Sequence, residues 1–280
     1  MGAPVRPACH MHLISDSTGE TLNVVARAAA AYYQHFRLIE RTYALVRGPE
    51  QLRSVLRKVE SNPGIVLFTL VDGELRDRLE ARCLEVGVPC ISVLDPVVAA
   101  LAAYLNTSPK PAAGAQHTLN TEYFNRIEAL DYAMLHDDGR HSETLDIADV
   151  ILIGVSRTSK TPTSMYLANR GLKVANIPVI AGLPLPQIPD ETNAPLVVGL
   201  VAAPLRIAQI RRNRLISLNQ GDETPYLDHR TIRKELLATK SLCLEKDWPV
   251  IDVTRRSIEE TAAAILNLLS ARRNEKRVGP

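Results

Sequence analysis

Between residues 154 and 161 the chain reads Gly154-Val155-Ser156-Arg157-Thr158-Ser159-Lys160-Thr161, directly after the apolar run 150–153 and directly before Pro162. This segment, the 154–161 loop, matches the P-loop pattern G-x-x-x-x-G-K-[ST] at every fixed position except the second glycine, where Ser159 stands. An apolar strand that leads into such a loop, followed by a helix with proline in its first turn, is the context that phosphate binding requires. The segment therefore predicts an α/β domain that binds a nucleotide.

Each part of the loop has an expected role in phosphate binding. Backbone N–H groups would surround the phosphate oxygens, and the positive end of the following helix would strengthen their hold. We expect Lys160 to reach the terminal phosphates and take part in catalysis, and the Thr161 hydroxyl to bind Mg²⁺. If the backbone at Ser159 is left-handed, serine there costs on the order of 1–2 kcal/mol relative to glycine. The alternative is a Ser/Thr-rich turn that binds nothing.

The residues around the loop predict a nucleotide-binding phosphotransferase domain at 146–280. Its apolar runs are expected to form strands at 150–153, 174–179, 196–200 and 250–253. Helices are expected between and after them, at 162–170, 204–217, 229–240 and 257–270. Apolar strands that alternate with helices are typical of a parallel sheet covered on both faces. Ser257 and Glu260 form the capping-box pattern S-x-x-E at the start of the last helix.

The first half of the chain shows the same alternation. We expect strands at 11–15, 38–46, 65–70 and 89–94, with helices at 20–34, 49–60 and 75–86. These elements predict an N-terminal parallel-sheet α/β domain at 1–106. Residues 107–145 are expected to connect the domains, with a linker rich in proline, glycine, serine and alanine, a helix at 121–135 and a turn at 136–139. The predicted fold is thus an N-terminal α/β domain followed by a P-loop kinase-like α/β domain.

The turn His136-Asp137-Asp138-Gly139 holds the densest group of candidate catalytic side chains. Phosphoryl transfer to a hydroxyl needs a metal holder and a carboxylate that orients the acceptor. We therefore expect His136, Asp137 and Asp138 at the catalytic centre, with one carboxylate on the acceptor hydroxyl and the other near Mg²⁺ or Lys160. A helix end followed by an ordinary Asp-Gly turn is the alternative.

Several arginines lie on or near the helix expected at 204–217, namely Arg206, Arg211, Arg212 and Arg214. Arginine binds phosphoryl oxygens with two parallel hydrogen bonds, and small kinases carry such residues on a lid over the phosphates. We expect Arg206, Arg211 and Arg214 to bind the nucleotide in this way. A solvated basic helix face is the alternative.

A second turn, Ser15-Asp16-Ser17-Thr18-Gly19-Glu20-Thr21, also joins an expected strand to an expected helix. Its small hydroxyl residues suit a pocket for an anion or a phosphoprotein. They suit an ordinary helix N-terminus equally well, and the residues alone do not decide between the two.

The composition argues against several other classes of protein. The net charge is only +2, whereas nucleic-acid and membrane-surface binders are usually strongly basic. The longest apolar run, 97–105, is much shorter than the roughly 20 residues that a membrane span needs. The first nine residues lack the apolar region of a secretory signal, and the cysteines form no CxxC pair. These features favour a cytoplasmic protein with ordinary thiols.

Several of these stretches together resemble one protein family. They are residues 14–21, 130–133, 136–139, 154–164 and the basic run 206–214. The string Gly-Val-Ser-Arg-x-x-Lys-Thr-Pro-Thr-Ser is far more specific than a general P-loop. Over about residues 11–272 the chain resembles the kinase/pyrophosphorylase family, and within it the bacterial regulators of pyruvate, phosphate dikinase.

The resemblance implies a bifunctional serine/threonine kinase and phosphorylase. Such a protein inactivates pyruvate, phosphate dikinase by transferring a phosphoryl group from ADP to an active-site threonine, and reverses the step with inorganic phosphate to give pyrophosphate. ADP, phosphate and Mg²⁺ are then its small-molecule partners, and the family's nucleotide site carries over to residues 154–161. Ser159 favours the dikinase branch over the branch that acts on phosphoenolpyruvate synthase, which tends to carry glycine there.

Two other functions remain open at this point. The second domain also has the layout of ATP-dependent small-molecule kinases, and a non-catalytic adaptor that senses ADP would need the same loop. A comparison of ADP with ATP as phosphoryl donor tests for the small-molecule kinase. ADP binding without turnover would identify the adaptor. We expect a homodimer, since most soluble oligomers are symmetric, and no nucleic-acid or membrane partner.

Overall fold

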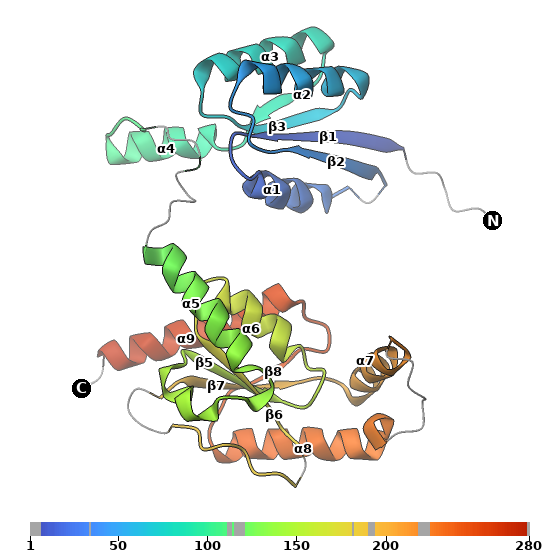
Figure 1. Ribbon diagram of the computed structural model, residues 1–280, viewed down its shortest axis with the longest axis vertical. Coiled ribbons are helices and arrows are strands. Elements are labelled where there is room, and N and C mark those ends of the chain that lie inside the picture. The colour runs from blue at the N-terminus through green and yellow to red at the C-terminus, as the bar shows by residue number, and fades with distance from the viewer. Residues whose placement is uncertain are drawn as a thin grey trace, which may run out of the picture. The chain divides into compact units, whose positions relative to one another are not determined.

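The computed structural model describes residues 7–33, 35–110, 114, 121–180, 182–189, 194–217 and 225–278. The chain divides into two compact units, Met1–Thr118 and Leu119–Pro280 (Figure 1). Each contains a four-stranded parallel sheet with helices on both faces, which confirms the α/β fold class. The segment expected to connect the domains is divided between the units, and its helix and the turn at 136–139 belong to the second.

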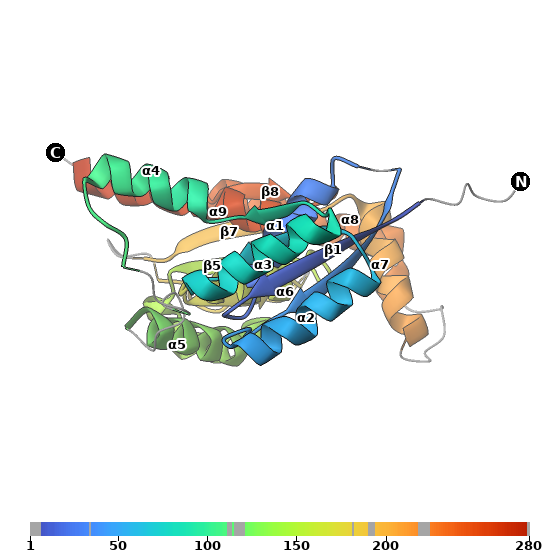
Figure 2. The same ribbon diagram turned by 90° about the horizontal axis from the view of Figure 1, so that it is seen from above.

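The first unit has the strand order β2-β1-β3-β4. Its strands are β1 (Ala8–Ser15), β2 (Arg37–Tyr43), β3 (Ile65–Thr69) and β4 (Cys90–Ser92), and helices α1 (Glu20–Ala30), α2 (Pro49–Ser61) and α3 (Gly73–Val86) cover the sheet. Successive strand residues face opposite sides of a sheet. Ile14 and Phe68 therefore join the core under α2 and α3, whereas Leu13 and Leu67 pack with Leu22 of α1. Figure 2 shows α2 and α3 over the same sheet.

A further helix, α4 (Asp95–Leu105), contains the apolar run for which the sequence pattern predicted no element. An unbroken apolar run has no helical periodicity, which is why the pattern did not reveal it. Pro96 lies in its first turn, so β4 ends earlier than predicted. None of its residues is buried, although Asp95 is its only charged residue. No described helix, α4 included, has both the length and the apolar character needed to cross a membrane.

The second unit has the corresponding strand order, β6-β5-β7-β8. Its strands are β5 (Val150–Gly154), β6 (Val174–Pro178), β7 (Leu196–Val201) and β8 (Val250–Asp252), and its helices are α5 (Thr121–Leu135), α6 (Lys160–Ala168), α7 (Pro204–Ser217), α8 (His229–Glu245) and α9 (Ile258–Val278). The described residues also form the short 3-10 turns η2 (Asp137–Gly139), η3 (Ser142–Ile147) and η4 (Pro225–Leu227). The predicted capping box is confirmed, because Ser257 N–H donates to Glu260 at 2.8 Å and Glu260 N–H donates to the Ser257 hydroxyl at 3.1 Å.

Both faces of the second sheet are covered by helices (Figure 1). α6 and α9 cover the face that contains Val150 and Leu152, and α8 covers the face that contains Ile151 and Ile153. The carboxyl ends of parallel strands lie at one edge of a sheet, which is where open α/β sheets bind ligands. The 154–161 loop, which follows β5, lies at this edge.

Candidate functional site

The backbone of the 154–161 loop is tightly constrained. β5 ends at Gly154, where a Cβ atom would lie 2.4 Å from the carbonyl oxygen of Leu200, so a larger residue does not fit. Arg157 and Ser159 both have a left-handed backbone, with φ of 76° and 60°. Each costs on the order of 1–2 kcal/mol for a residue with a Cβ atom, and such strain collects at functional loops. The left-handed backbone considered for Ser159 is thus present.

This backbone leaves a row of amide groups without partners. Among the described residues, no backbone hydrogen bond uses the N–H of residues 156–159. α6 begins directly after them at Lys160, so the unpaired N–H groups of its first turn and its positive end adjoin the row. Consecutive free N–H groups beside a helix N-terminus form an anion-binding nest. The loop backbone can therefore bind phosphate oxygens.

The Lys160 side chain lies inside the loop. It is 5% exposed, and its Nζ donates to the carbonyl oxygen of Val155 at 3.2 Å. The Thr158 hydroxyl donates to the same oxygen at 3.0 Å. Burial lowers the pKa of Lys160 from its ordinary value of 10.5 to about 8, and the carboxylates of Asp138 and Asp137 offset part of this effect. A phosphate bound in the loop would provide the negative charge that stabilises this buried ammonium group.

Asp137 and Thr161 are brought together beside the loop. The Thr161 hydroxyl donates to Oδ1 of Asp137 at 2.9 Å. Asn176, in the middle of β6, donates from Nδ2 to the same carboxylate oxygen and, at 3.0 Å, to the Thr161 hydroxyl oxygen. Sequence reasoning missed Asn176, whose only signal is a polar residue in an otherwise apolar strand. The three side chains form one hydrogen-bonded cluster, which we call the Asp137 cluster.

Asp138 lies apart from the Asp137 cluster, on the wall of a cavity. Its backbone is left-handed, with φ of 54°, and its side chain is exposed. The cavity has a volume of about 250 Å³ and is lined by Asp138, Ser156, Arg157, Ser159, Lys160, Thr161, Pro162 and Ile210. The loop therefore borders a space that can hold an anion, with a free carboxylate at its margin.

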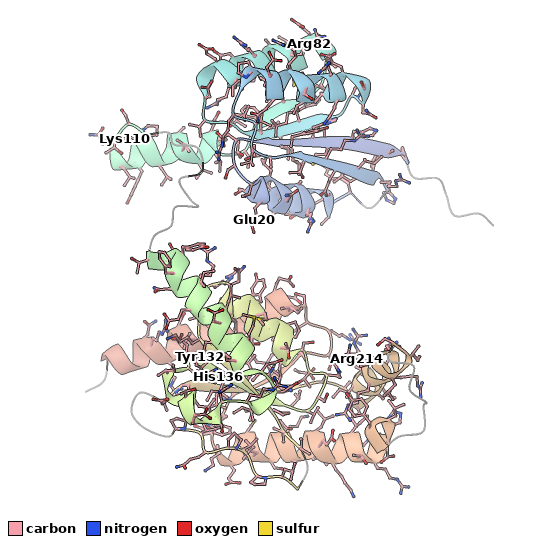
Figure 3. The ribbon with its side chains drawn as sticks, viewed as in Figure 1. Glu20, Arg82, Lys110, Tyr132, His136 and Arg214 are labelled. Atoms are coloured by element: carbon pink, nitrogen blue, oxygen red, sulfur yellow. The ribbon has the colours of Figure 1, made fainter. Side chains whose placement is uncertain are left out.

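His136 lies beside Tyr132 (Figure 3), and neither of its ring nitrogens contacts the 154–161 loop, so the catalytic role predicted for it does not fit this arrangement. Its ring is buried and stacks on Tyr132 with the centroids 3.7 Å apart. Nδ1 is 2.8 Å from the Tyr132 carbonyl oxygen and Nε2 is 2.7 Å from the Thr144 hydroxyl. With both ring nitrogens engaged, His136 fixes the start of the turn that carries the two aspartates.

The predicted phosphate-binding arginines have three different environments. Arg206 lines a second cavity of about 240 Å³, whose other polar and charged residues are Arg157, Ser159, Thr254, Arg255, Arg256 and Ser257. Arg211 is 1% exposed and pairs with Glu235 at 2.7 Å, so it is already engaged inside the unit. Arg214 lies exposed near the end of α7 (Figure 3). Arg206 therefore lines a cavity next to the loop, whereas Arg211 is paired within the unit.

The oxygen atoms at this site suit Mg²⁺ without enclosing it. The Thr161 hydroxyl and the carboxylates of Asp137 and Asp138 are the hard ligands that this cation prefers. Across the described ranges, no group of three or more His, Cys, Asp or Glu residues is placed to hold a metal ion. Mg²⁺ commonly binds through one or two carboxylates together with substrate phosphates. The residues present therefore fit Mg²⁺ as a companion of a bound nucleotide.

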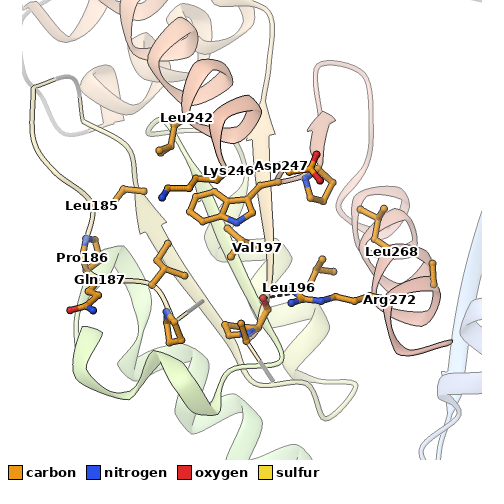
Figure 4. Close-up of a pocket in the computed structure, with 17 residues that line it drawn as sticks. Leu185, Pro186, Gln187, Leu196, Val197, Leu242, Lys246, Asp247, Leu268 and Arg272 are labelled. Atoms are coloured by element: carbon orange, nitrogen blue, oxygen red, sulfur yellow. Dashed lines mark hydrogen bonds between the residues drawn. The ribbon is translucent and has the colours of Figure 1, made fainter. Parts of the chain in front are cut away.

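A much larger cavity in the described part of the second unit lies elsewhere (Figure 4). It has a volume of about 790 Å³, and Leu196, Trp248 and Arg272 are among its lining residues. Arg272 donates to the carbonyl oxygen of Pro195 at 2.7 Å on its wall. Leu196 begins β7, so this cavity lies at the opposite edge of the parallel sheet from the 154–161 loop. It contributes nothing to the loop site.

The turn at 15–21 follows β1 of the first unit, as the 154–161 loop follows β5 of the second. The Asp16 carboxylate accepts from Val71 N–H at 2.8 Å, and the Ser15 hydroxyl accepts from Ser17 N–H at 3.1 Å. α1 begins after Gly19, whose φ is 77°. A cavity of about 230 Å³ adjoins the turn. These contacts explain how the turn is held, and an anion or phosphoprotein pocket there stays a prediction.

Comparison with known proteins gives a consistent result. Residues 11–266 match the family described as kinase/pyrophosphorylase. A protein of Rhodopseudomonas palustris strain HaA2, named as a candidate pyruvate, phosphate dikinase regulatory protein, is 53% identical over 268 residues, which cover 95% of this chain and 96% of its own. A protein of Maricaulis maris strain MCS10 with the same name is 53% identical over 265 residues, 95% of each chain. Among solved structures, one match is a periplasmic solute-binding protein of an ABC transporter from Actinobacillus succinogenes 130z, solved with D-allose. The match covers 95% of this chain and 92% of that chain, but the sequence identity is 10% and the TM-score is 0.25, so it carries no inference.

Proposed function

This chain belongs to the kinase/pyrophosphorylase family, and we propose that it is a bifunctional regulator of pyruvate, phosphate dikinase. In this proposal it inactivates the dikinase by transferring a phosphoryl group from ADP to an active-site threonine. It reactivates the dikinase when inorganic phosphate removes that group as pyrophosphate. The names of the relatives support the choice of target, and the chemistry of the loop site supports the phosphoryl transfer.

In the proposed forward reaction, the free N–H groups of residues 156–159 and the Lys160 ammonium group bind the two phosphates of ADP. Thr161 and Asp137 would hold Mg²⁺, which screens the phosphate charge when it is bound. Asp138 accepts a hydrogen bond from the target hydroxyl, whose oxygen attacks the β-phosphorus in line. The bond from that phosphorus to the bridging oxygen breaks, AMP leaves, and the hydroxyl proton passes to Asp138. Arg206 offsets the charge that develops during transfer.

The reverse reaction uses the same groups. Inorganic phosphate occupies the loop and attacks the phosphorus of the phosphothreonine. A new P–O–P linkage forms, the bond from phosphorus to the threonine oxygen breaks, and pyrophosphate leaves. The threonine oxygen regains its proton from Asp138, which now acts as the general acid. One anion site therefore serves both directions.

One observation carries this proposal. The unpaired amides of residues 156–159, the buried ammonium group of Lys160 and the free carboxylate of Asp138 belong to one loop site and its cavity. These groups are an anion holder, a countercharge and a base, which are the parts that phosphoryl transfer to a hydroxyl needs. A cytoplasmic location and a homodimeric state belong to the same proposal.

The test follows a labelled phosphoryl group in both directions. The chain is incubated with purified pyruvate, phosphate dikinase and ADP labelled in the β-phosphate. We expect label on one threonine and release of AMP, and then labelled pyrophosphate after phosphate is added. Asp138→Asn keeps the shape of the side chain but removes the base, so it should still bind ADP and lose both reactions.

Other outcomes of this experiment would support different functions. Transfer only to phosphoenolpyruvate synthase would assign the chain to the other branch of the family. Transfer from ATP to a metabolite would identify a small-molecule kinase. Saturable ADP binding with neither phosphothreonine nor pyrophosphate would identify a nucleotide-sensing adaptor, and any of these three results would overturn the proposal.

A further inference from the structure

Asn176 is a buried amide in a strand that is otherwise apolar. It is 1% exposed, and its neighbours in β6 are Ala175 and Ile177, both in the hydrophobic core. Burying an amide away from water is destabilising unless hydrogen bonds compensate. The strand would be more stable with a β-branched apolar residue here, so the amide calls for a physical explanation.

The partners of Asn176 are two residues of the proposed nucleotide site. Nδ2 donates to Oδ1 of Asp137 and, at 3.0 Å, to Oγ1 of Thr161. An ionised carboxylate has only acceptors, so the donor end of the amide must face Asp137. The backbone N–H of Asn176 also donates to the carbonyl oxygen of His136 at 3.0 Å. Main chain and side chain of one residue thus tie the turn at 136–139 to β6.

The amide has no other structural task among the described residues. Its Oδ1 is buried and has no hydrogen-bond partner there. An unsatisfied buried acceptor destabilises the folded state. Asn176 is therefore a costly residue, and the side-chain hydrogen bonds that it makes to described residues go to Asp137 and Thr161.

The hydrogen bonds from Asn176 and to Asp137 use most of the bonding capacity of the Thr161 hydroxyl. A hydroxyl has one proton to donate and two lone pairs that accept. The proton goes to Asp137 at 2.9 Å, and one lone pair accepts from Asn176 at 3.0 Å. One lone pair remains, and its direction is fixed by the other two contacts. Asp137 is fixed in the same way, since its Oδ1 accepts from both partners and leaves Oδ2 available.

We propose that Asn176 is a positioning residue that holds Thr161 and Asp137 as a preformed pair of oxygen ligands for the divalent cation of the nucleotide. The inference rests on the proposed function, since it assumes that the 154–161 loop binds ADP together with Mg²⁺. Asn176 acts through its two neighbours and is not itself a ligand. Partners that orient metal ligands commonly contribute 10-fold to 100-fold in metal affinity.

The test measures metal binding directly, with Mn²⁺ as a spectroscopic substitute for Mg²⁺. Mn²⁺ is titrated by electron paramagnetic resonance into the full chain with and without saturating ADP. We expect Asn176→Val to weaken ADP-dependent Mn²⁺ binding roughly 10-fold or more. Binding of ADP without metal should change less than about twofold, because the loop amides and Lys160 are untouched. Asn176→Ser, which is smaller, gives the same comparison if the valine variant does not fold.

Thr163→Val is the matched control. Thr163 is also fully buried, lies in α6, and has a hydroxyl without a partner in the described structure. Its replacement removes a buried polar group of the same unit without touching the Asp137 cluster, so Mn²⁺ binding should stay at the natural level. In an Asp137→Asn background, Asn176→Val should have a smaller further effect, because the part of its role that acts through Asp137 is already lost.

Two results would overturn the inference in distinguishable ways. If the natural chain binds Mn²⁺ with ADP, and Asn176→Val does so equally well, Asn176 has only a structural role and the proposed function is unaffected. If the natural chain binds ADP but never Mn²⁺, the proposed function is wrong about the metal ion, and the role proposed for Asn176 is wrong with it.

Discussion

Replacement of Lys160 by methionine should make the folded chain more stable while it removes nucleotide binding. Burial lowers the pKa of Lys160 from 10.5 to about 8. At roughly 1.4 kcal/mol per pKa unit, folding disfavours the charged side chain by about 3 kcal/mol. Methionine has a similar length and no charge, and it loses one hydrogen bond worth about 1 kcal/mol. The Val155 carbonyl oxygen keeps its bond from Thr158, so the net gain should be about 2 kcal/mol.

The assay is urea unfolding without nucleotide, followed by the fluorescence of Trp248. This is the chain's only tryptophan and lies in the second unit, so it reports the unit that contains the loop. A lowered lysine pKa destabilises the folded state most at a pH at which Lys160 is protonated in both the folded and the unfolded chain. This range lies below about pH 8. As the pH rises from about 8 towards 10.5, the folded natural chain loses this proton and the penalty fades. The stability advantage of Lys160→Met should therefore be largest near pH 7 and shrink above pH 8.

Lys234→Met serves as the control, because Lys234 is exposed on α8 and its charge remains hydrated in the folded state. It should change the free energy of unfolding by less than about 0.5 kcal/mol at either pH. The proposed cost of the buried charge is wrong if Lys160→Met destabilises the second unit at pH 7, or if its effect does not depend on pH. Either result would mean that the loop already neutralises the ammonium group without an anion.

Three further predictions follow from other parts of the structure. Gly154→Ala places a Cβ atom 2.4 Å from the carbonyl oxygen of Leu200, so calorimetry should show a destabilisation of about 1–3 kcal/mol together with weaker ADP binding. Arg206→Ala should lower the rate of transfer from ADP more than 10-fold, whereas Arg214→Ala should leave it within about twofold, and equal rates would exclude a role for Arg206. Leu101→Glu should convert the proposed homodimer to a monomer in light scattering, because α4 has no buried residue within the chain; an unchanged mass would exclude α4 from the contact.

The sequence was most informative where the signal was local. The motif from Gly154 to Thr161 placed the loop between a strand and a helix, and the helices at 121–135 and 204–217 have the predicted bounds. The apolar runs indicated parallel sheets because both faces of such sheets are buried. In contrast, the apolar run 97–105 has no helical periodicity, so its pattern did not predict a helix. The helix begins with Pro96 in its first turn, and the pattern of apolar residues does not include this signal.

The site was only partly predictable, because its contacts join distant parts of the chain. Asp137 and Asp138 are adjacent in sequence, yet one contacts Thr161 and the other lines the cavity. Asn176 has no motif, since a lone polar residue in an apolar strand does not reveal its partners. Arg211 looked like a solvated or phosphate-binding cation, but Glu235 from the next helix neutralises it inside the core. Charge and spacing identify such residues, and only tertiary packing determines what they face.

The proposed function depends on the backbone amides of residues 156–159, which bind the phosphates of ADP in it. Nitrogen–proton correlation spectra of the labelled chain test this directly, with ADP, pyrophosphate and adenosine added in separate titrations. We expect large changes in these four amide signals with ADP and with pyrophosphate, and none with adenosine, because an anion supplies the missing hydrogen-bond acceptors. ADP binding that leaves the four amide signals unmoved would show that these amides do not bind the phosphates.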